Sequence, residues 1–170
     1  VLKRMKRYYT VEKYLEQIDA LKAAVPGMTI STDFIVGFPG ETEEDFEATL
    51  RLLERVRFDS SFSFMYSPRP NTPALKLVDD VPLEDKKRRL YVLQELQKRI
   101  SIEQNAALVG TNTRVLVEGT SRHNPAELTG RSPGNKMVNF PGHPRLIGQE
   151  VPVKVLSAHV NSLRGDLVLQ

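Results

Sequence analysis

The sequence predicts an α/β protein with two parts, a partial α/β sheet in residues 1–107 and a small antiparallel five-stranded β-barrel in residues 108–170. Apolar residues recur at helical spacing in three stretches of the first part, and short β-branched or aromatic runs lie between them. The last third is a series of short strand-like segments separated by Gly and Pro. A chain of 170 residues, 40% hydrophobic and 26% charged, has the composition of a folded protein.

The first part alternates helices and strands. Thr10 is a plausible N-cap for a helix that Pro26-Gly27 ends, and residues 28–36 are apolar and β-branched as in a buried parallel strand. Thr42 to Asp45 resembles a capping box, so a second helix follows. Residues 60–66 alternate as a strand, and a last helix covers residues 82–107. Residues 1–5 are a third candidate strand, which still leaves too few strands to close a barrel.

The strand candidates of the second part are residues 113–117, 127–131, 136–140, 150–158 and 163–169, which together suit a small barrel. The positive charge of the chain lies here. Residues 106–170 carry 7 Lys and Arg against 4 Asp and Glu, whereas residues 1–105 carry 17 of each. This mild excess permits an anionic partner without requiring one.

The strand-to-helix turn around residues 33–41 is the first candidate site. A Gly-rich turn at a helix start offers free backbone N–H groups to the charged end of a cofactor, and Gly37 and Gly40 allow a close approach. Asp33, within an apolar strand, suits a cationic or hydroxyl group of a ligand. The alternative is a purely structural turn in which Asp33 pairs with a neighbouring Arg.

Three further features each have a functional and a structural interpretation. The Pro-rich loop of residues 66–73 presents Arg69 at the predicted ligand edge, or is only a crossover loop. The run from Lys86 to Arg89 is best interpreted as a solvated helix surface. The basic second part, with Phe140 as an exposed aromatic, fits RNA binding by phosphate contact and stacking, or a capping domain with scattered charge.

Several classes of protein are excluded. The chain has no Cys, so it is no disulfide scaffold and cannot by itself hold a Cys-bound zinc ion or iron–sulfur cluster. Its apolar runs are too short to cross a membrane, and its first residues have no apolar stretch behind them, so we expect no signal peptide. It begins with Val1, which suggests a piece of a longer protein. The residues alone leave two hypotheses open: an enzyme fragment with a nucleic-acid-binding tail, or a non-enzymatic binding module.

Three stretches carry a resemblance to a known family: LKRMKRYYT (residues 2–10), ISTDFIVGFPGET (residues 30–42) and YSPRPNTP (residues 66–73). They resemble the radical S-adenosylmethionine methylthiotransferases, and residues from about 107 onward resemble the TRAM domain of that family. The stretches LTGR (residues 128–131), VNFPG (residues 138–142) and NSLRGDL (residues 161–167) are most similar to its tRNA-modifying members.

The resemblance implies a fold and an activity. Residues 1–107 would be the last strands and helices of a partial (β/α) radical-SAM barrel, and residues 108–170 the OB-like TRAM domain. The whole enzyme would add a methylthio group to carbon 2 of N6-(dimethylallyl)adenosine beside the anticodon. One 4Fe-4S cluster would cleave S-adenosylmethionine to a hydrogen-abstracting radical, and a second would carry the sulfur. The Cys ligands belong to parts of the family that this sequence lacks, so we expect no cluster and no activity in this chain alone.

The resemblance also assigns residues, partners and a location. It implies cofactor-binding positions at Arg4, Arg7, Asp33, Ile35, Val36 and Gly37. It implies substrate or tRNA contacts at Arg69, Arg131, Lys136, Asn139, Phe140 and Arg164. The match to the general pattern GxIxGxxE is partial, because Gly40 stands at the Glu position and Glu41 one place late. The expected partners are tRNA and the missing N-terminal domain and early barrel, in the cytoplasm and without a membrane.

Two expectations remain open at this point. The family also contains enzymes that methylthiolate an aspartate of a ribosomal protein, and these are the alternative within the family. Removal of the early strands would leave a parallel strand edge unpaired, so we expect self-association of residues 1–108 in isolation.

Overall fold

The computed structural model describes residues 1–122 and 124–168. These form two compact units, Val1–Ile100 and Ser101–Gln170, and each is described by itself. In the first unit, helix α1 (Val11–Ala24) precedes strand β1 (Ser31–Val36), helix α2 (Glu43–Val56) and strand β2 (Ser60–Met65). The 3₁₀ turn η1 (Pro73–Lys76) then leads to helix α3 (Leu83–Ala106), of which the part up to Ile100 belongs to this unit.

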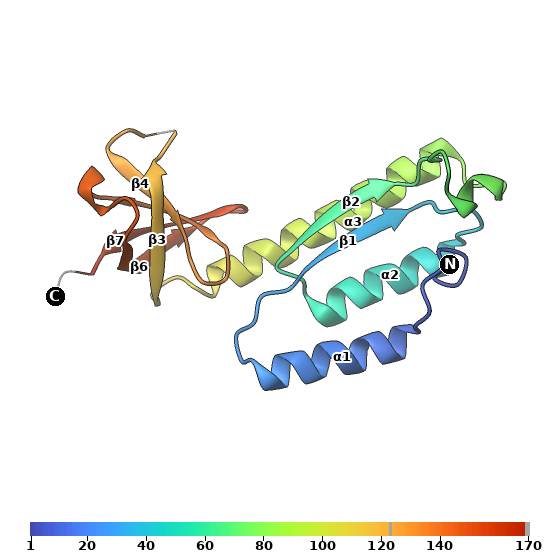
Figure 1. Ribbon diagram of the computed structural model, residues 1–170, viewed down its shortest axis with the longest axis horizontal. Helices are drawn as coiled ribbons and strands as arrows, with labels where there is room; N and C mark the ends of the chain where they lie inside the picture. The colour runs from blue at the N-terminus through green and yellow to red at the C-terminus, as the bar shows by residue number, and fades with distance from the viewer. Residues whose placement is uncertain (123, 169–170) are drawn as a thin grey trace. The chain divides into compact units, whose positions relative to one another are not determined.

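Strands β1 and β2 pair in parallel, with Ser31 opposite Ser60 and Val36 opposite Met65. The connection between them is α2, so the predicted β-α-β unit is confirmed (Figure 1). The expected strand at residues 1–5 is wrong. These residues form turns instead, because the Met5 N–H bonds to the Val1 carbonyl at 3.0 Å and the Arg7 N–H to the Leu2 carbonyl at 2.9 Å.

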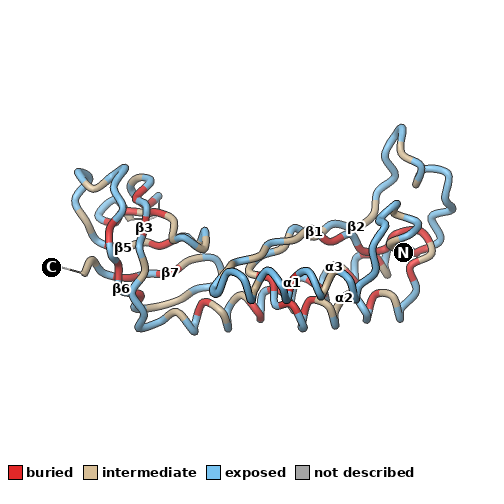
Figure 2. Tube along the Cα trace, turned by 60° about the horizontal axis from the view of Figure 1, so that its bottom comes forward, coloured by how far each residue is buried: buried red, intermediate tan, exposed pale blue. Residues whose placement is uncertain are grey.

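The sheet is covered by helices on one face only. The core joins β1, α2 and α3 through buried side chains: Phe34, Val36, Phe46, Leu53, Val56, Leu93 and Ile100. Burial alternates along both strands, and Figure 2 shows buried residues recurring at intervals along the helices. The opposite face of the sheet stays open, with exposed fractions of 46% for Ile35, 66% for Phe62 and 55% for Phe64. The alternation predicted for residues 60–66 is therefore confirmed, and its aromatic face is the uncovered one.

Helix α2 begins with the predicted capping box. The Thr42 Oγ1 accepts the Asp45 N–H at 3.2 Å, and the Asp45 carboxylate accepts the Thr42 N–H at 3.0 Å. The backbone bond from Thr42 lowers the pKa of the Asp45 carboxyl, and the bond from Arg88 lowers the pKa of Glu43. The start of α2 is thus held by two carboxylates in their charged form.

We expect the stability of the first unit to fall in acid. A carboxyl group whose pKa is lowered on folding stabilises the fold above its unfolded pKa, near 4. That contribution is lost as the pH falls through the lower folded pKa.

Asp45→Asn should flatten the dependence of the melting temperature on pH between about 5 and 3. Thr42→Ala, which removes the other half of the capping box, should cost about 1 kcal/mol at pH 7. Thermal melts followed by circular dichroism test both, with exposed Glu95→Gln as the control. An equally steep acid loss in Asp45→Asn would contradict the expectation.

The second unit is a closed barrel with strand order β3-β4-β5-β7-β6. The strands are β3 (Asn112–Thr120), β4 (Glu127–Arg131), β5 (Met137–Pro141), β6 (Glu150–Ala158) and β7 (Ser162–Leu167), and the 3₁₀ turn η2 (Pro144–Leu146) precedes β6. The predicted five-stranded barrel is confirmed within the described residues. Its pairs are antiparallel except for β5 and β7, which pair in parallel. Fully buried side chains fill it: Val115, Val117, Leu128, Val138, Phe140, Val153, Val155 and Leu163.

Candidate functional site

The turn between β1 and α2 is a closed hydrogen-bonded structure. The Gly37 N–H donates to Glu41 Oε1 at 2.8 Å, and the Gly40 N–H donates to Asp80 Oδ1 at 2.6 Å. The Glu41 N–H bonds to the Phe38 carbonyl at 2.8 Å. The expectation of free backbone N–H groups is therefore wrong at these three positions, because carboxylates and a carbonyl of the chain itself already satisfy them. A ligand at this edge must use side chains instead.

Glu41, which departs from the general pattern by one place, has a structural role here. Its carboxylate is 4% exposed and pairs with the Arg89 guanidinium, 6% exposed, at 2.8 Å. Arg89 Nη1 also donates to the Glu41 carbonyl at 3.1 Å, and Arg89 Nη2 lies 3.2 Å from Glu43 Oε2. This buried pair connects the turn after β1 to α3.

Lys86 makes a second connection one helical turn away. Its Nζ lies 2.6 Å from Asp79 Oδ1 and 5.3 Å from the centre of the Tyr66 ring, and its aliphatic stem occupies the space beside Gly37. The interpretation of residues 86–89 as a solvated surface is therefore wrong for Lys86 and Arg89. Lys87 and Arg88 fit it, with side chains 54% and 48% exposed. Lys86 and Arg89 are three residues apart and therefore share one face of α3, and this spacing in the sequence could have indicated that they lie in the same environment.

The open face of the β1–β2 sheet carries two of the expected cofactor positions. Asp33 and Ile35 are exposed on it, opposite Phe62 and Phe64 in the strand register. Asp33 forms no ion pair within residues 1–122 and 124–168, so the alternative of a neighbouring Arg partner is not observed. Phe62 and Phe64 were not among the expected site residues, although their alternation with serines indicated a shared face.

Val36 and Gly37, two further expected cofactor positions, do not lie on the open face of the sheet. Val36 is 1% exposed and packs in the core under the helices, because neighbouring residues of a strand face opposite sides of the sheet. Gly37 is buried beneath Lys86. The side chain of Val36 therefore cannot line the open face, and the Gly37 N–H is already bonded.

The expected arginines of the first unit lie in two loops. Arg4 Nη2 donates to the Gly40 carbonyl at 2.7 Å, which attaches the N-terminal residues to the turn after β1. Arg7 is exposed. Arg69 is also exposed, in the Pro-rich loop whose Thr72 Oγ1 donates to the Arg69 carbonyl at 2.8 Å. That loop begins at Tyr66, whose N–H bonds to the Val36 carbonyl at 2.8 Å, so it leaves from the same strand ends.

On the barrel, β4, β5 and β7 bring several of the expected RNA contacts together. Asn139 is the register partner of both Thr129 and Arg164. The Arg164 guanidinium pairs with the Glu127 carboxylate. Arg131 on β4 donates to the Asn135 carbonyl at 3.1 Å, in the turn that precedes Lys136. These residues thus belong to neighbouring strands and one turn of the same unit.

Phe140 does not belong to that group. It is fully buried, with 0% of its surface exposed, among the core side chains of the barrel. The expectation that it is an exposed aromatic for stacking is therefore wrong. The alternation of β5 decides its direction, since Val138 and Phe140 point inward while Met137 and Asn139 point outward.

Neither a metal cluster nor a membrane-spanning helix is present in the part of the chain that the structure describes. No group of three or more His, Cys, Asp or Glu side chains within residues 1–122 and 124–168 is placed to hold a metal ion. No helix among them combines the length and apolar character needed to cross a bilayer.

Two families match this chain. Residues 1–53 match the Radical SAM superfamily, and residues 106–168 match the TRAM domain. The first match covers α1, β1 and most of α2, and the second covers the barrel.

Curated relatives match across nearly the whole chain. Proteins named tRNA-2-methylthio-N(6)-dimethylallyladenosine synthase from Alkalilimnicola ehrlichii, Bordetella petrii and Salmonella enteritidis PT4 are 55%, 56% and 51% identical to it. The alignments cover 99%, 96% and 99% of this chain and 38%, 34% and 35% of those proteins. The chain therefore spans a little over a third of the length of the relatives that it matches.

Proposed function

Because this chain belongs to the radical S-adenosylmethionine methylthiotransferase family, we propose that it is the part of a tRNA-modifying enzyme that forms one wall of the S-adenosylmethionine site and binds tRNA. The enzyme would add a methylthio group to carbon 2 of N6-(dimethylallyl)adenosine beside the anticodon. The observation that carries this proposal is the identity of 50–56% over at least 96% of the chain to proteins named for that product. The ribosomal-protein alternative has no such support among these relatives.

The open sheet face fits S-adenosylmethionine. Asp33 offers an exposed carboxylate that forms no ion pair within the described residues, which suits an ammonium or ribose hydroxyl group of the ligand. Ile35, Phe62 and Phe64 offer apolar surface beside it for an adenine ring. Of the two expected arginines, Arg4 is the better supported, because its bond to Gly40 fixes it at the carboxyl end of β1. The Gly37 backbone and the Val36 side chain would support this wall from behind.

The bound cofactor would supply the hydrogen-abstracting chemistry and the methyl group. This chain supplies no thiolate, since it has no Cys, and its residues therefore do not fit an iron–sulfur cluster. We propose that both 4Fe-4S clusters are held by parts of the enzyme outside these 170 residues, with a cytoplasmic location for the whole. We also propose domain limits of 1–107 and 108–170, which the end of α3 at Ala106 and the TRAM match from residue 106 support.

The outer surface of β4, β5 and β7 is the proposed tRNA-binding face of the barrel. It combines Arg131, Asn139 and Arg164 with Lys136 in the adjoining turn. Arginine and amide side chains on such a face can bond to phosphate oxygens and base edges. Arg69 of the first unit would contact substrate at the strand ends.

Charge reversal tests this face. The pair Arg131→Glu/Lys136→Glu should weaken binding of the 170-residue chain to an anticodon stem–loop RNA and lower the slope of log K against log salt by about 2, about one for each lost phosphate contact. Fluorescence anisotropy at four salt concentrations measures both quantities. The matched control is Arg51→Glu/Lys98→Glu, two exposed cations of α2 and α3. An unchanged slope relative to this control would show that the barrel face does not contact RNA.

A further inference from the structure

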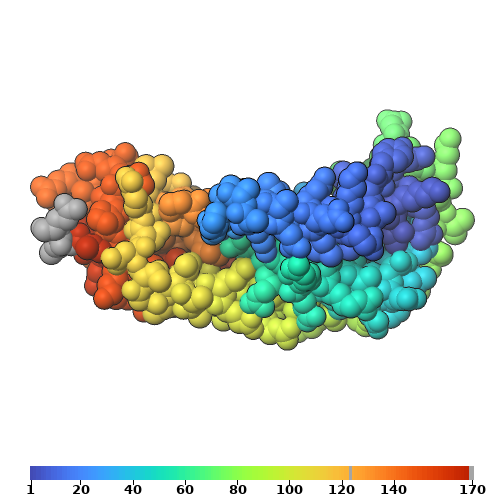
Figure 3. All heavy atoms as spheres, turned by 90° about the horizontal axis from the view of Figure 1, so that it is seen from below, coloured from blue at the N-terminus to red at the C-terminus, as the bar shows by residue number. Residues whose placement is uncertain are grey.

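The first ten residues form a basic loop, which we call the N-terminal loop. It carries four cations, Lys3, Arg4, Lys6 and Arg7, and the first acidic residue of the chain is Glu12. Figure 3 shows this segment, in the darkest blue, at the surface of the first unit beside the cyan atoms of the turn after β1. The loop is therefore a concentrated positive patch outside the barrel.

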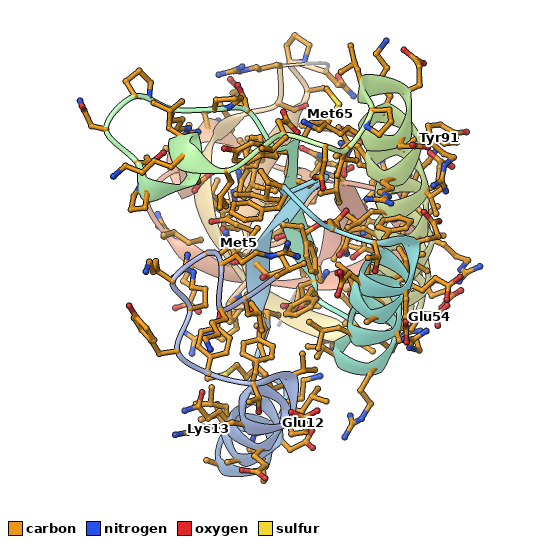
Figure 4. All side chains as sticks on the ribbon, turned by 90° about the vertical axis from the view of Figure 1, so that its right-hand side faces the viewer. Met5, Glu12, Lys13, Glu54, Met65 and Tyr91 are labelled. Atoms are coloured by element: carbon orange, nitrogen blue, oxygen red, sulfur yellow. The ribbon has the colours of Figure 1, made fainter. Side chains whose placement is uncertain are left out.

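The loop has a defined conformation. Its backbone closes on itself through bonds from the N–H groups of Met5, Lys6 and Arg7 to the carbonyls of Val1, Lys3 and Leu2, at 3.0, 3.1 and 2.9 Å. Lys6 adopts a left-handed φ of 60° within this loop. Figure 4 shows Met5 in this loop, between α1 and the strand ends. The cations are thus presented by an organised backbone, which lowers the entropy cost of binding.

Gly40 fixes the loop to the rest of the unit. Its carbonyl accepts Arg4 and its N–H donates to Asp80, so one residue joins three segments. It has a φ of +74°, and a Cβ there would overlap the Arg4 guanidinium. Replacement by Ala would therefore displace the loop without changing its charge.

Three of the four cations of this loop have no ion-pair partner within the described residues. Lys3, Lys6 and Arg7 are exposed and form no ion pair or side-chain hydrogen bond within the described residues. The exposed cations of the helices differ, since Arg55 pairs with Asp19 at 2.9 Å and Arg88 with Glu43. Unpaired cations on an ordered loop create a positive potential that attracts a polyanion.

An exposed aromatic ring follows the cations directly. Tyr8 is 87% exposed, whereas the next residue, Tyr9, stacks on Tyr14 with ring centres 6.1 Å apart. Tyr8 thus offers a free ring face beside phosphate-binding charges. Alternating cations and stacking rings are typical of surfaces that bind single-stranded nucleic acid.

The N-terminal loop and the Pro-rich loop lie at the same end of the sheet. The Pro-rich loop leaves β2 at Tyr66, and the Tyr66 ring meets the Phe38 ring of the β1–α2 turn edge-on at 5.0 Å. Arg4 attaches the N-terminal loop to the same turn at Gly40. Both loops therefore border the carboxyl ends of the strands, where ligands of parallel sheets bind.

We propose that the N-terminal loop is a second RNA-contact surface, in which Lys3, Lys6 and Arg7 bind phosphates and Tyr8 stacks on an unpaired base. The inference rests on the proposed function, because it takes RNA as the substrate. It adds a contact that directs the loop of a stem–loop RNA toward the strand ends of the first unit. This surface is distinct from the barrel face, so the two can be removed separately.

RNA binding by loop variants of the 170-residue chain tests the proposal. Lys3→Gln/Arg7→Gln should lower the salt slope for an anticodon stem–loop by about 2 relative to Lys13→Gln/Lys98→Gln, an equal loss of charge elsewhere. Tyr8→Ala should weaken binding by between about 5-fold and 100-fold, as expected for loss of one base stack. The same Tyr8→Ala change should leave binding to a fully paired duplex of equal length unchanged, because its bases are not free to stack.

The outcomes separate this proposal from the proposed function. If the unmodified chain does not bind the stem–loop RNA, the proposed function itself fails. If it binds and the loop variants behave as the Lys13/Lys98 control does, the second surface is refuted while the barrel face stands.

Gly40→Ala should reduce binding as the charge variants do, and full RNA affinity in a folded Gly40→Ala protein would contradict the role of the anchored loop. A Tyr8→Ala effect of equal size on duplex RNA would refute base stacking.

Discussion

Replacement of Arg89 by Met is expected to destabilise the first unit by about 3–5 kcal/mol. The change leaves the Glu41 carboxylate, 4% exposed, without the cation that compensates its burial. Arg89 also bonds to the Glu41 carbonyl, so the turn after β1 loses two contacts with α3 at once. Urea unfolding followed by helical circular dichroism measures the effect, because α1, α2 and most of α3 belong to this unit.

The control is Arg99→Met, which removes an exposed partner of Glu54 at 3.5 Å and should cost less than about 1 kcal/mol. The double variant Glu41→Gln/Arg89→Met should recover part of the loss, since it leaves no buried charge unpaired. A cost for Arg89→Met within 1 kcal/mol of the control would contradict the structural role of this pair. Figure 4 shows Glu54 on the outer side of the helices, away from Met5 and the strand ends.

Replacement of Phe140 by Ala is expected to destabilise the barrel by about 3–5 kcal/mol, because it opens a cavity in a fully packed core. Met137→Ala, on the same strand but 37% exposed, should cost much less. Loss of the amide NMR signals of β4 and β5 with increasing urea reports the unfolding of this unit. Equal midpoints for the two variants would show that Phe140 is not a core residue.

Phe140→Leu separates a core role from a stacking role. Leucine keeps most of the buried volume and should leave the barrel folded at 25 °C, so RNA affinity should change less than twofold. If the side chain stacked on a base, a folded Phe140→Leu protein would lose about the energy of one stack. Such a loss would support base stacking by Phe140, one of the two interpretations that the sequence left open.

Much of the fold follows from local patterns. Thr10 and the box from Thr42 to Asp45 begin their helices where the sequence predicts, since capping depends on residues three apart. The strands Glu127–Arg131 and Glu150–Ala158 also begin and end as predicted. Residues 1–5 show where local patterns fail to predict the structure. They are apolar enough for a strand, but turn bonds within the segment satisfy the backbone instead.

For the candidate site, the sequence indicated which residues to consider better than it indicated the face of the sheet toward which their side chains point. Asp33 and Ile35 lie on the open face, whereas Val36 points to the core and Phe140 fills the barrel. A one-residue shift along a strand reverses the face, so direction depends on which side of the sheet is covered. Phe62 and Phe64 became part of the candidate site only when helices proved to cover the other face.

The sequence by itself determined the two-part architecture, the helix starts and the resemblance to a family, because these depend on composition and on residues near one another in the chain. Only the tertiary structure decided which charged residues are buried and which are free. Lys86 pairs with Asp79, which lies outside α3, and Arg89 pairs with Glu41, which lies far from it in the chain. By contrast, Lys3, Lys6 and Arg7 form no ion pair within the described residues. A charge is stabilised by whatever surrounds it in space, and that surrounding is set by packing between distant segments.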